Sequence, residues 1–136
     1  GHGWTYSAHP LCAAAGVANL KLLDELGLVH NAGETGAHLR AAMADALGEH
    51  PHVGEVRGAG MLCAVELVES RAPRRFFETP GQVAGKVIAE MAARGVIARA
   101  MPEGDIIGFA PPLSLTREEA EKLADVTGQA VRAVLG

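Results

Sequence analysis

Three side chains that can donate hydrogen bonds stand together just before a predicted helix. Thr5, Tyr6 and Ser7 precede Pro10, and proline is favoured at the first helical position because that position needs no N–H donor. The free N–H groups of a first helical turn attract anions, and nearby hydroxyl groups add donors, so the pattern suits a phosphate. Spacing alone favours a simpler explanation, in which Ser7 or His9 caps the helix and Thr5 lies in a turn.

Arg99 is the second candidate, because it ends a predicted strand beside the turn-rich segment 100–104. Scaffolds often present side chains to ligands at such places, and the planar guanidinium group matches a carboxylate with two hydrogen bonds. The alternative is an ordinary solvated charge, which spacing alone favours because surface arginines are common. Residue type and position therefore make Arg99 a candidate for carboxylate binding and no more.

Other familiar patterns are incomplete. Gly58-Ala59-Gly60 lacks the third glycine and the following helix of a dinucleotide-binding loop, so a tight turn or bulge is the better interpretation. His50 and His52 flank a proline in a turn, but no cysteine or carboxylate stands at metal-ligand spacing, and we predict no metal site. Cys12 and Cys63 lie in apolar stretches, which predicts buried, reduced thiols rather than a disulfide.

Composition limits the class of protein. The 136 residues allow one domain with a real core, and 49% are hydrophobic but only 4% aromatic, which predicts slender, closely packed helices. The net charge of −4, with both signs mixed, argues against the basic face that nucleic-acid binding requires. No apolar run approaches the roughly 20 residues of a membrane span. We therefore expect no nucleic-acid or membrane partner and a soluble, cytoplasmic protein.

The apolar periodicity predicts the elements that must position these residues. Helical spacing predicts helices over residues 10–26, 31–48, 82–94 and 116–134, with residues 28–30 as a joint and Gly48 in left-handed conformation at the end of the second. Alternating segments predict strands at 53–57, 61–68, 96–99 and 105–110, the last two as an antiparallel hairpin, with an exposed loop at 70–81. Thr116 and Glu119 form a capping box at the start of the last helix. This order predicts a two-layer α+β fold rather than a Rossmann sheet.

Several segments, in order along the chain, carry a resemblance to a known family. Residues 2–10, HGWTYSAHP, match the pattern HG-x-TYS-(G/A)-HP, and residues 56–61, VRGAGM, match V-R-G-x-G-(L/M). The segments 95–99 and 104–113 follow as they do in that family. In these segments the chain resembles the class III pyridoxal-phosphate-dependent aminotransferases, particularly the ω-amino acid or amine:pyruvate transaminases. The similarity covers essentially the whole sequence.

The resemblance implies a fold and an activity. Members of the family have fold type I, with a large cofactor domain and a small C-terminal domain, and act as dimers whose active sites lie at the subunit interface. This sequence resembles the final third, so we expect a missing large domain upstream, a cofactor-phosphate loop and interdomain helix over residues 1–26, and the small α+β domain over 27–136. The activity expected of the parent enzyme is transfer of an amino group from an amine or ω-amino acid to a keto acid such as pyruvate.

The resemblance also implies roles for individual residues. Thr5 corresponds to a residue that hydrogen-bonds the phosphate of pyridoxal 5'-phosphate in the partner subunit, with Tyr6 and the neighbouring backbone beside it. Arg99 corresponds to the arginine that receives the substrate carboxylate and swings aside for amine substrates. Trp4 occupies a variable aromatic position near the mouth of the pocket, and Ala8 stands where many members have glycine.

The family's cofactor-binding lysine, and the aspartate that contacts the pyridinium nitrogen, are absent from this sequence. Lys21, Lys86 and Lys122 lie on predicted helices, outside the motif around that lysine, so we predict no catalytic residue here and an inactive isolated chain. Two alternatives stay open. One is a non-catalytic α+β module that binds a ligand or a partner; the other is a decarboxylase or racemase on the same scaffold.

Overall fold

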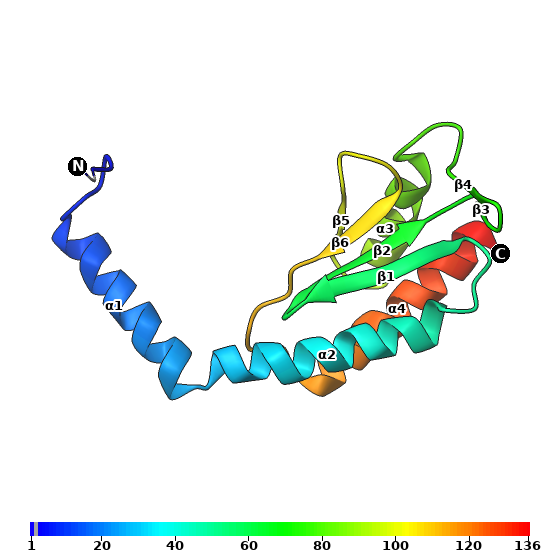
Figure 1. Cartoon of the computed structure of the whole chain (residues 1–136). Helices are drawn as coiled ribbons and strands as arrows, with labels where there is room; N and C mark the ends of the chain where they lie inside the picture. The colour runs from blue at the N-terminus through cyan, green and yellow to red at the C-terminus, as the bar shows by residue number, and fades with distance from the viewer. Residues whose placement is uncertain (2) are drawn as a thin grey trace.

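The chain forms a small antiparallel sheet with helices packed against it, and one helix stands apart from this body (Figure 1). The computed structural model describes residue 1 and residues 3–136. Within them the helices are α1 (Pro10–Glu25), α2 (Leu28–Leu47), α3 (Gln82–Ala93) and α4 (Arg117–Leu135). The strands are β1 (Val53–Ala59), β2 (Leu62–Leu67), β3 (Ser70–Arg71), β4 (Arg74–Arg75), β5 (Arg99–Ala100) and β6 (Ile106–Phe109). The predicted α+β order is confirmed, with the short β3–β4 hairpin added.

The main sheet has the strand order β1-β2-β6-β5, and every pairing in it is antiparallel. β1 turns into β2 at Gly60, whose φ of +53° lies in the left-handed region that glycine adopts at little cost. The tight turn predicted around residues 58–60 is therefore confirmed. Along β2 the side chains of Cys63, Val65 and Leu67 are buried, whereas those between them are more exposed. Because side chains alternate across a strand, one face of the sheet is covered and the other is open.

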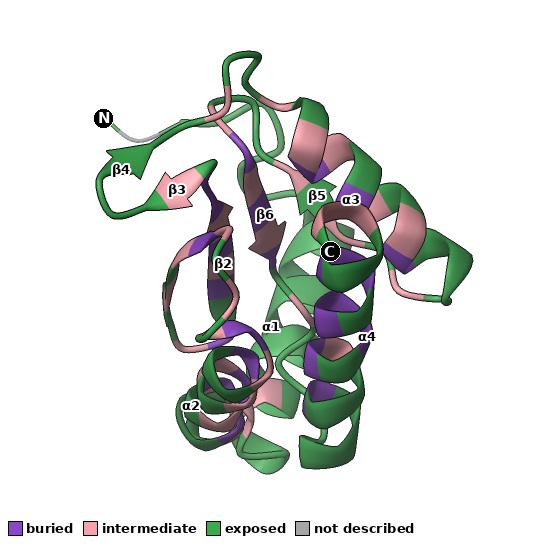
Figure 2. Ribbon diagram, turned by 90° about the vertical axis from the view of Figure 1, so that its right-hand side faces the viewer, coloured by how far each residue is buried: buried purple, intermediate pink, exposed green. Residues whose placement is uncertain are grey.

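The core lies between the covered face of the sheet and the helices α2, α3 and α4 (Figure 2). Fully buried side chains come from all three helices and from β2 and β6: Leu39, Met43, Leu47, Val65, Val87, Met91, Ile107 and Val131. Helix α4 also buries Ala120, Ala124 and Ala130, and such small side chains let the helix backbone approach its neighbours closely. The close packing follows from the alanine-rich composition.

Helix α1 buries none of its residues and projects away from this body (Figure 1). The joint between α1 and α2 is Leu26-Gly27, with Gly27 at a φ of +58°, and not residues 28–30 as the sequence predicts. The left-handed glycine breaks the helical path, whereas nothing in residues 28–30 prevents the first turn of α2 from forming there. Cys12 lies on α1 and is exposed, so the prediction of two buried thiols is wrong for Cys12 and confirmed for Cys63; both are free.

Two other predicted details are wrong. Gly48 follows α2 with a φ of −61°, an ordinary right-handed value, and its N–H donates to the carbonyl of Ala44. β5 is only two residues long, where the sequence predicts a strand over 96–99. Continuing its register would place Ile97 opposite Ala110, just before two prolines, and prolines cannot extend a hydrogen-bonded ladder.

The local signals at helix ends are confirmed. The Thr116 hydroxyl accepts a hydrogen bond from the Glu119 N–H at 3.2 Å, and the Glu119 carboxylate accepts one from the Thr116 N–H at 2.9 Å. Gly95 follows α3 with a φ of +82°, as expected of a helix-stopping glycine. Over the described residues, no helix combines the length and the apolar character needed to cross a bilayer.

Candidate functional site

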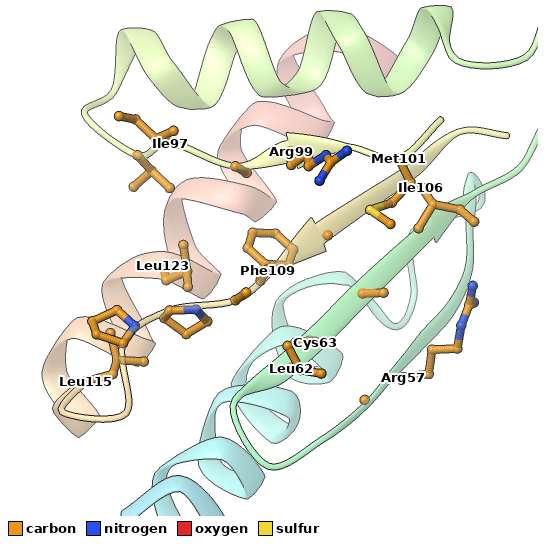
Figure 3. Close-up of a pocket in the computed structure, with 18 of the residues that line it drawn as sticks. Arg57, Leu62, Cys63, Ile97, Arg99, Met101, Ile106, Phe109, Leu115 and Leu123 are labelled. Atoms are coloured by element: carbon orange, nitrogen blue, oxygen red, sulfur yellow. The ribbon is translucent and has the colours of Figure 1, made fainter. Parts of the chain in front are cut away.

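The open face of the sheet forms one wall of a broad groove (Figure 3). The groove has a volume of about 1330 Å³ and lies between the sheet, the segment 95–98 that follows α3, and the segment 110–112 that follows β6. Most of its lining is apolar and comes from Leu62, Ala64, Ile97, Met101, Ile106 and Phe109. A groove of this kind, with few polar groups, is typical of sites that bind small molecules.

A row of four residues crosses the open face, with an arginine at each end. Arg99 pairs with Gly108, Gly108 pairs with Ala64, and Ala64 pairs with Arg57. Residues directly opposite one another in a sheet project from the same face, so both arginines belong to the groove. They lie on opposite sides of it (Figure 3). The two residues between them are small, which leaves the floor of the groove open.

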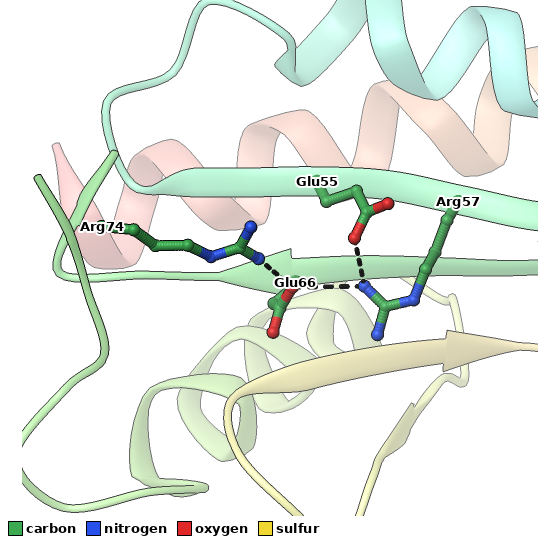
Figure 4. A network of polar contacts seen from close by, with 4 residues as sticks. All are labelled: Glu55, Arg57, Glu66 and Arg74. Atoms are coloured by element: carbon green, nitrogen blue, oxygen red, sulfur yellow. Dashed lines mark hydrogen bonds and ion pairs between the residues drawn. The ribbon is translucent and has the colours of Figure 1, made fainter. Parts of the chain in front are cut away.

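The two arginines differ in their electrostatic surroundings. Arg57 donates to the carboxylates of Glu55 at 2.9 Å and Glu66 at 3.2 Å, and Glu66 also holds Arg74 from the β3–β4 hairpin (Figure 4). The charge of Arg57 is therefore used within the fold. Arg99 is exposed and forms no ion pair with any residue that the structure describes. Its guanidinium group is free to bind a carboxylate.

The second predicted site, at the N-terminus, forms a hydrogen-bonded turn. The Trp4 N–H donates to the Ser7 hydroxyl at 2.7 Å, and the Ser7 N–H donates to the Trp4 carbonyl at 2.9 Å. His9 is the N-cap of α1, but its side chain makes no capping hydrogen bond. The simpler explanation, in which Ser7 or His9 satisfies the first helical turn, is therefore wrong. Thr5 does lie in a turn, and its hydroxyl has no partner among the described residues.

The local geometry at the N-terminus also explains one feature of the motif. Ala8 has a φ of +58°, the left-handed conformation that glycine adopts more easily, and glycine is the residue that the motif pattern allows there. His2, the first residue of the motif, lies outside the described residues. Trp4 and Tyr6 are both largely exposed, at 77% and 73%.

The structure does not bring the two predicted sites together. Thr5, Tyr6 and Trp4 stand at the far end of α1, whereas Arg99 lies on β5 in the body of the domain (Figure 1). Each set faces solvent by itself. Sequence reasoning assigned no role to two residues close to Arg99 along the hairpin. They are the buried Asp105, and Gly108, which lies opposite Arg99 in the sheet. A glycine inside a predicted strand often marks a close approach, which could have singled out Gly108.

Among the described residues, the remaining reactive side chains do not form a site. Burial raises the pKa of the Cys63 thiol, which keeps it in its unreactive neutral form. Lys21, Lys86 and Lys122 are exposed on α1, α3 and α4, as the sequence predicts. In the part of the chain that the structure describes, histidine, cysteine and acidic side chains form no cluster with the geometry of a metal site.

Comparison with known proteins decides the family. The model of the family "Aminotransferase class-III" matches residues 1–131. The chain belongs to the class III aminotransferases. Members of this family depend on pyridoxal 5'-phosphate. The motif resemblance found in the sequence is thereby confirmed.

Individual aminotransferases show the same likeness. A diaminobutyrate–2-oxoglutarate transaminase from Halomonas elongata is 49% identical over 98% of this chain and 29% of its own length. A putrescine–pyruvate aminotransferase from Pseudomonas aeruginosa is 36% identical over 90% of this chain and 26% of its own length. A solved structure from the directed evolution of transaminases by ancestral reconstruction has a TM-score of 0.93 and 49% identity, over 98% of this chain and 29% of that one. This class III aminotransferase chain thus spans less than a third of the length of these relatives.

Proposed function

We propose that the enzyme to which this chain belongs transfers an amino group from an amine or ω-amino acid to a keto acid such as pyruvate. The observation that carries the proposal is the guanidinium group of Arg99, which has no ion-pair partner among the described residues and lies in a groove with a mostly apolar lining. The two relatives named above act, by their names, on 2-oxoglutarate and pyruvate, and each of these acceptors has a carboxylate next to its reacting carbonyl. Arg99 binds that carboxylate and orients the carbonyl. Trp4 lines the mouth of the substrate pocket.

The N-terminal turn fits the phosphate of pyridoxal 5'-phosphate. Thr5 presents a hydroxyl with no partner among the described residues, and the first turn of α1 has no side-chain cap, so its N–H groups are available to an anion. Thr5 donates to the phosphate, and Tyr6 lies beside it. When bound, the cofactor supplies the electron sink that lets an amino group move between carbon skeletons. The residues of this chain hold the phosphate and the substrate carboxylate in place.

The chain contributes to the active site without completing it. Residues 1–26 form the phosphate loop and a helix between domains, and residues 27–136 form the small domain. The lysine that binds the cofactor covalently belongs to the large domain, so the chain by itself is inactive. The phosphate loop binds the cofactor of the partner subunit in a homodimer. Thr5 and Arg99 of one chain therefore need not lie in the same active site.

The exposed apolar surface supports this proposal over a self-sufficient binding module. Helix α1 leaves several large aliphatic side chains in solvent: Leu11, Val17, Leu20 and Leu22. A helix that carries large apolar side chains on several sides is normally buried against other parts of a protein. A module that works alone would form a compact monomer, whereas this chain is expected to self-associate when it is isolated.

The decisive experiment compares two acceptors in the full-length enzyme carrying Arg99→Ala. Pyruvate and butanal both present a carbonyl, but only pyruvate has a carboxylate. We expect the KM for pyruvate to rise by roughly tenfold or more, the size expected for lost hydrogen bonds to a charged group, while the KM for butanal changes less than about twofold. Arg117→Ala, at an exposed arginine of α4, is the matched control. Equal effects of Arg99→Ala on both acceptors would contradict the role of Arg99.

The absence of a cofactor-binding lysine is tested on the chain alone. The purified chain is mixed with pyridoxal phosphate, reduced with borohydride and analysed by intact mass. We expect no stoichiometric adduct at a single site. A single adduct on Lys21, Lys86 or Lys122 would mean that the chain has a complete cofactor site of its own.

A further inference from the structure

Arg99 stands on a weakly attached piece of the sheet. β5 has only two residues, lies at the edge of the sheet and pairs with β6 alone, through Arg99 with Gly108 and Ala100 with Ile107. One further hydrogen bond, from the Met101 N–H to the Ile106 carbonyl at 2.8 Å, closes the hairpin. β6 is itself held by its pairing with β2 and by the buried Ile107, and Ala100 of β5 is packed against the core. The position of β5 relative to the helices depends in addition on the contacts at the two ends of the hairpin.

Asp105, at the base of this hairpin, is buried and tied to two other elements. It is 4% exposed, and among the described residues it is the one acidic residue in the buried class. Its carbonyl accepts a hydrogen bond from the Leu67 N–H at 2.8 Å, which extends the pairing of β6 with β2. Its carboxylate oxygen Oδ1 accepts a hydrogen bond from the Ala84 N–H at 2.8 Å, in the first turn of α3. Asp105 therefore joins β2, α3 and the hairpin.

The first turn of α3 depends on this distant carboxylate. The N-cap residue, Gly81, has no side chain to accept a hydrogen bond, and the first turn contains no acidic residue. Asp105, which lies 21 positions after Ala84, supplies the missing acceptor and places a negative group at the positive end of the helix. The segment between β5 and β6 also packs directly on this end of α3, since a Cβ atom at Gly81 would lie 3.8 Å from the Gly104 carbonyl oxygen.

The opposite end of α3 leads into β5. The helix ends at Ala93, the Val96 N–H returns to the Met91 carbonyl at 3.0 Å, and the chain then reaches Arg99. The hairpin is thus connected to α3 at both ends: covalently through residues 94–98, and through the Asp105 carboxylate at the other end. A shift of either connection moves Arg99 relative to the groove.

We infer that Asp105 is a positioning residue for Arg99, which holds the guanidinium group where it binds the substrate carboxylate. This inference rests on the proposed function, because it concerns the binding of a keto acid. Asp105 itself touches no substrate. It acts through the position of the hairpin, so its loss should weaken the recognition of a carboxylate more than it weakens the rest of the reaction.

The test uses the full-length enzyme with pyruvate and butanal as acceptors. Asp105→Ala removes the connection, and we expect the KM for pyruvate to rise by roughly tenfold, because sub-ångström to ångström displacements of positioning groups have effects of at least this size. The KM for butanal should change less than about twofold. Asp105→Asn keeps an oxygen that can accept from the Ala84 N–H, and it should restore the KM for pyruvate to near the wild-type value.

Two further variants keep the inference open to contradiction. Asp105→Glu retains the carboxylate but lengthens the connection by one methylene group, so it should raise the KM for pyruvate even if Asp105→Ala fails to fold. Asp45→Ala, at an exposed carboxylate of α2, is the control and should change neither KM. Equal changes for both acceptors, or a fall in Tm with the ratio of the two KM values unchanged, would overturn the inference. If the wild-type enzyme transaminates neither acceptor, the proposed function fails instead.

Discussion

Gly108 lies directly opposite Arg99 in the sheet, and the side chain of Met101 occupies the space above this glycine. A Cβ atom at Gly108 would lie 2.8 Å from the Met101 sulfur, closer than such atoms approach in folded proteins. Arg99 and Met101 are two positions apart on the same strand path, so both side chains belong to the open face. The absence of a side chain at Gly108 therefore gives the side chain of Met101 room beside the groove.

Gly108→Ala should lower the free energy of unfolding by about 1 kcal/mol, because the added methyl group forces Met101 out of its place. Met101 can move at modest cost since its thioether is flexible. The double variant Gly108→Ala, Met101→Ala should be less destabilised than the sum of the two single variants. Urea denaturation of the four proteins in a double-mutant cycle measures this coupling, and strict additivity would show that the contact has no energetic effect.

Gly36→Ala should be far more harmful than Gly33→Ala, although both residues lie in α2. A Cβ atom at Gly36 would lie 1.9 Å from the backbone carbonyl oxygen of Gly60, so α2 and the β1–β2 turn would have to separate. We expect a loss of about 3 kcal/mol or more, typical of overpacking against backbone. Gly33 has no atom within 4 Å of that position, and alanine there should stabilise the helix by roughly 0.5–1 kcal/mol. Thermal unfolding of the two variants is the measurement, and equal Tm values would refute the packing argument.

The stability of the domain should fall in mild acid because of His50. Its Nδ1 accepts a hydrogen bond from the His52 N–H at 3.2 Å, and its Nε2 is buried without a partner. Burial, with smaller contributions from the nearby charges of His52 and Arg132, lowers the pKa of His50 below 6.5. As the pH falls, His50 is therefore protonated in the unfolded chain before it is protonated in the folded protein. The contribution of His50 to the free energy of unfolding is complete above about pH 6.5. It decreases below that pH until the folded-state pKa is passed.

The measurement compares the free energy of unfolding at pH 7.5 and 5.5 for the wild type and for His50→Asn. Asparagine offers an oxygen that can accept from the His52 N–H but does not titrate. The wild type should lose more stability between the two pH values than this variant does. His30→Asn, at an exposed histidine of α2, should keep the wild-type dependence. If His50→Asn also keeps it, the acid sensitivity comes from elsewhere.

Thr116→Ala should destabilise α4 by about 1 kcal/mol, the usual loss for an N-cap residue. The hydrogen bond from the Thr116 N–H is the main cause of the lowered pKa of the Glu119 carboxyl group, followed by that from its hydroxyl. Because its pKa is lowered in the folded state, the Glu119 carboxylate stabilises the fold above about pH 4.5. This stabilisation is lost as the pH falls through the folded-state pKa. The variant should therefore also raise the pKa of Glu119, which an NMR titration can detect. Ser114→Ala, just outside the capping box, should leave that pKa unchanged.

Thr5→Ala should weaken the retention of pyridoxal phosphate by the full-length enzyme about tenfold or more, since a hydrogen bond to a charged group contributes roughly 1.5–3 kcal/mol. Equilibrium dialysis of the apoenzyme against pyridoxal phosphate gives the dissociation constant without relying on turnover. Thr79→Ala, at an exposed threonine outside the N-terminal turn, is the matched control. An unchanged dissociation constant in Thr5→Ala would remove Thr5 from the phosphate site.

The family and most of the elements could be predicted from the sequence because their signals are local. The capping box at Thr116, the stop at Gly95 and the proline that begins α1 each act within a few residues of the backbone they shape. The position of the joint was wrong because Gly27 could end one helix and immediately begin the next. The candidate residues Thr5 and Arg99 were singled out by their positions and then matched to the family motifs, and their assigned roles stay predictions.

Only the tertiary structure decided how these residues are held. The sequence does not reveal that Asp105 caps α3, which begins much earlier in the chain at Gln82, or that Gly108 makes room for Met101. Nor does it reveal that Glu55 and Glu66 neutralise Arg57 while Arg99 has no such partner among the described residues. Such contacts form between segments distant in sequence, and they exist only once burial of the core brings those segments together, so no local pattern specifies them.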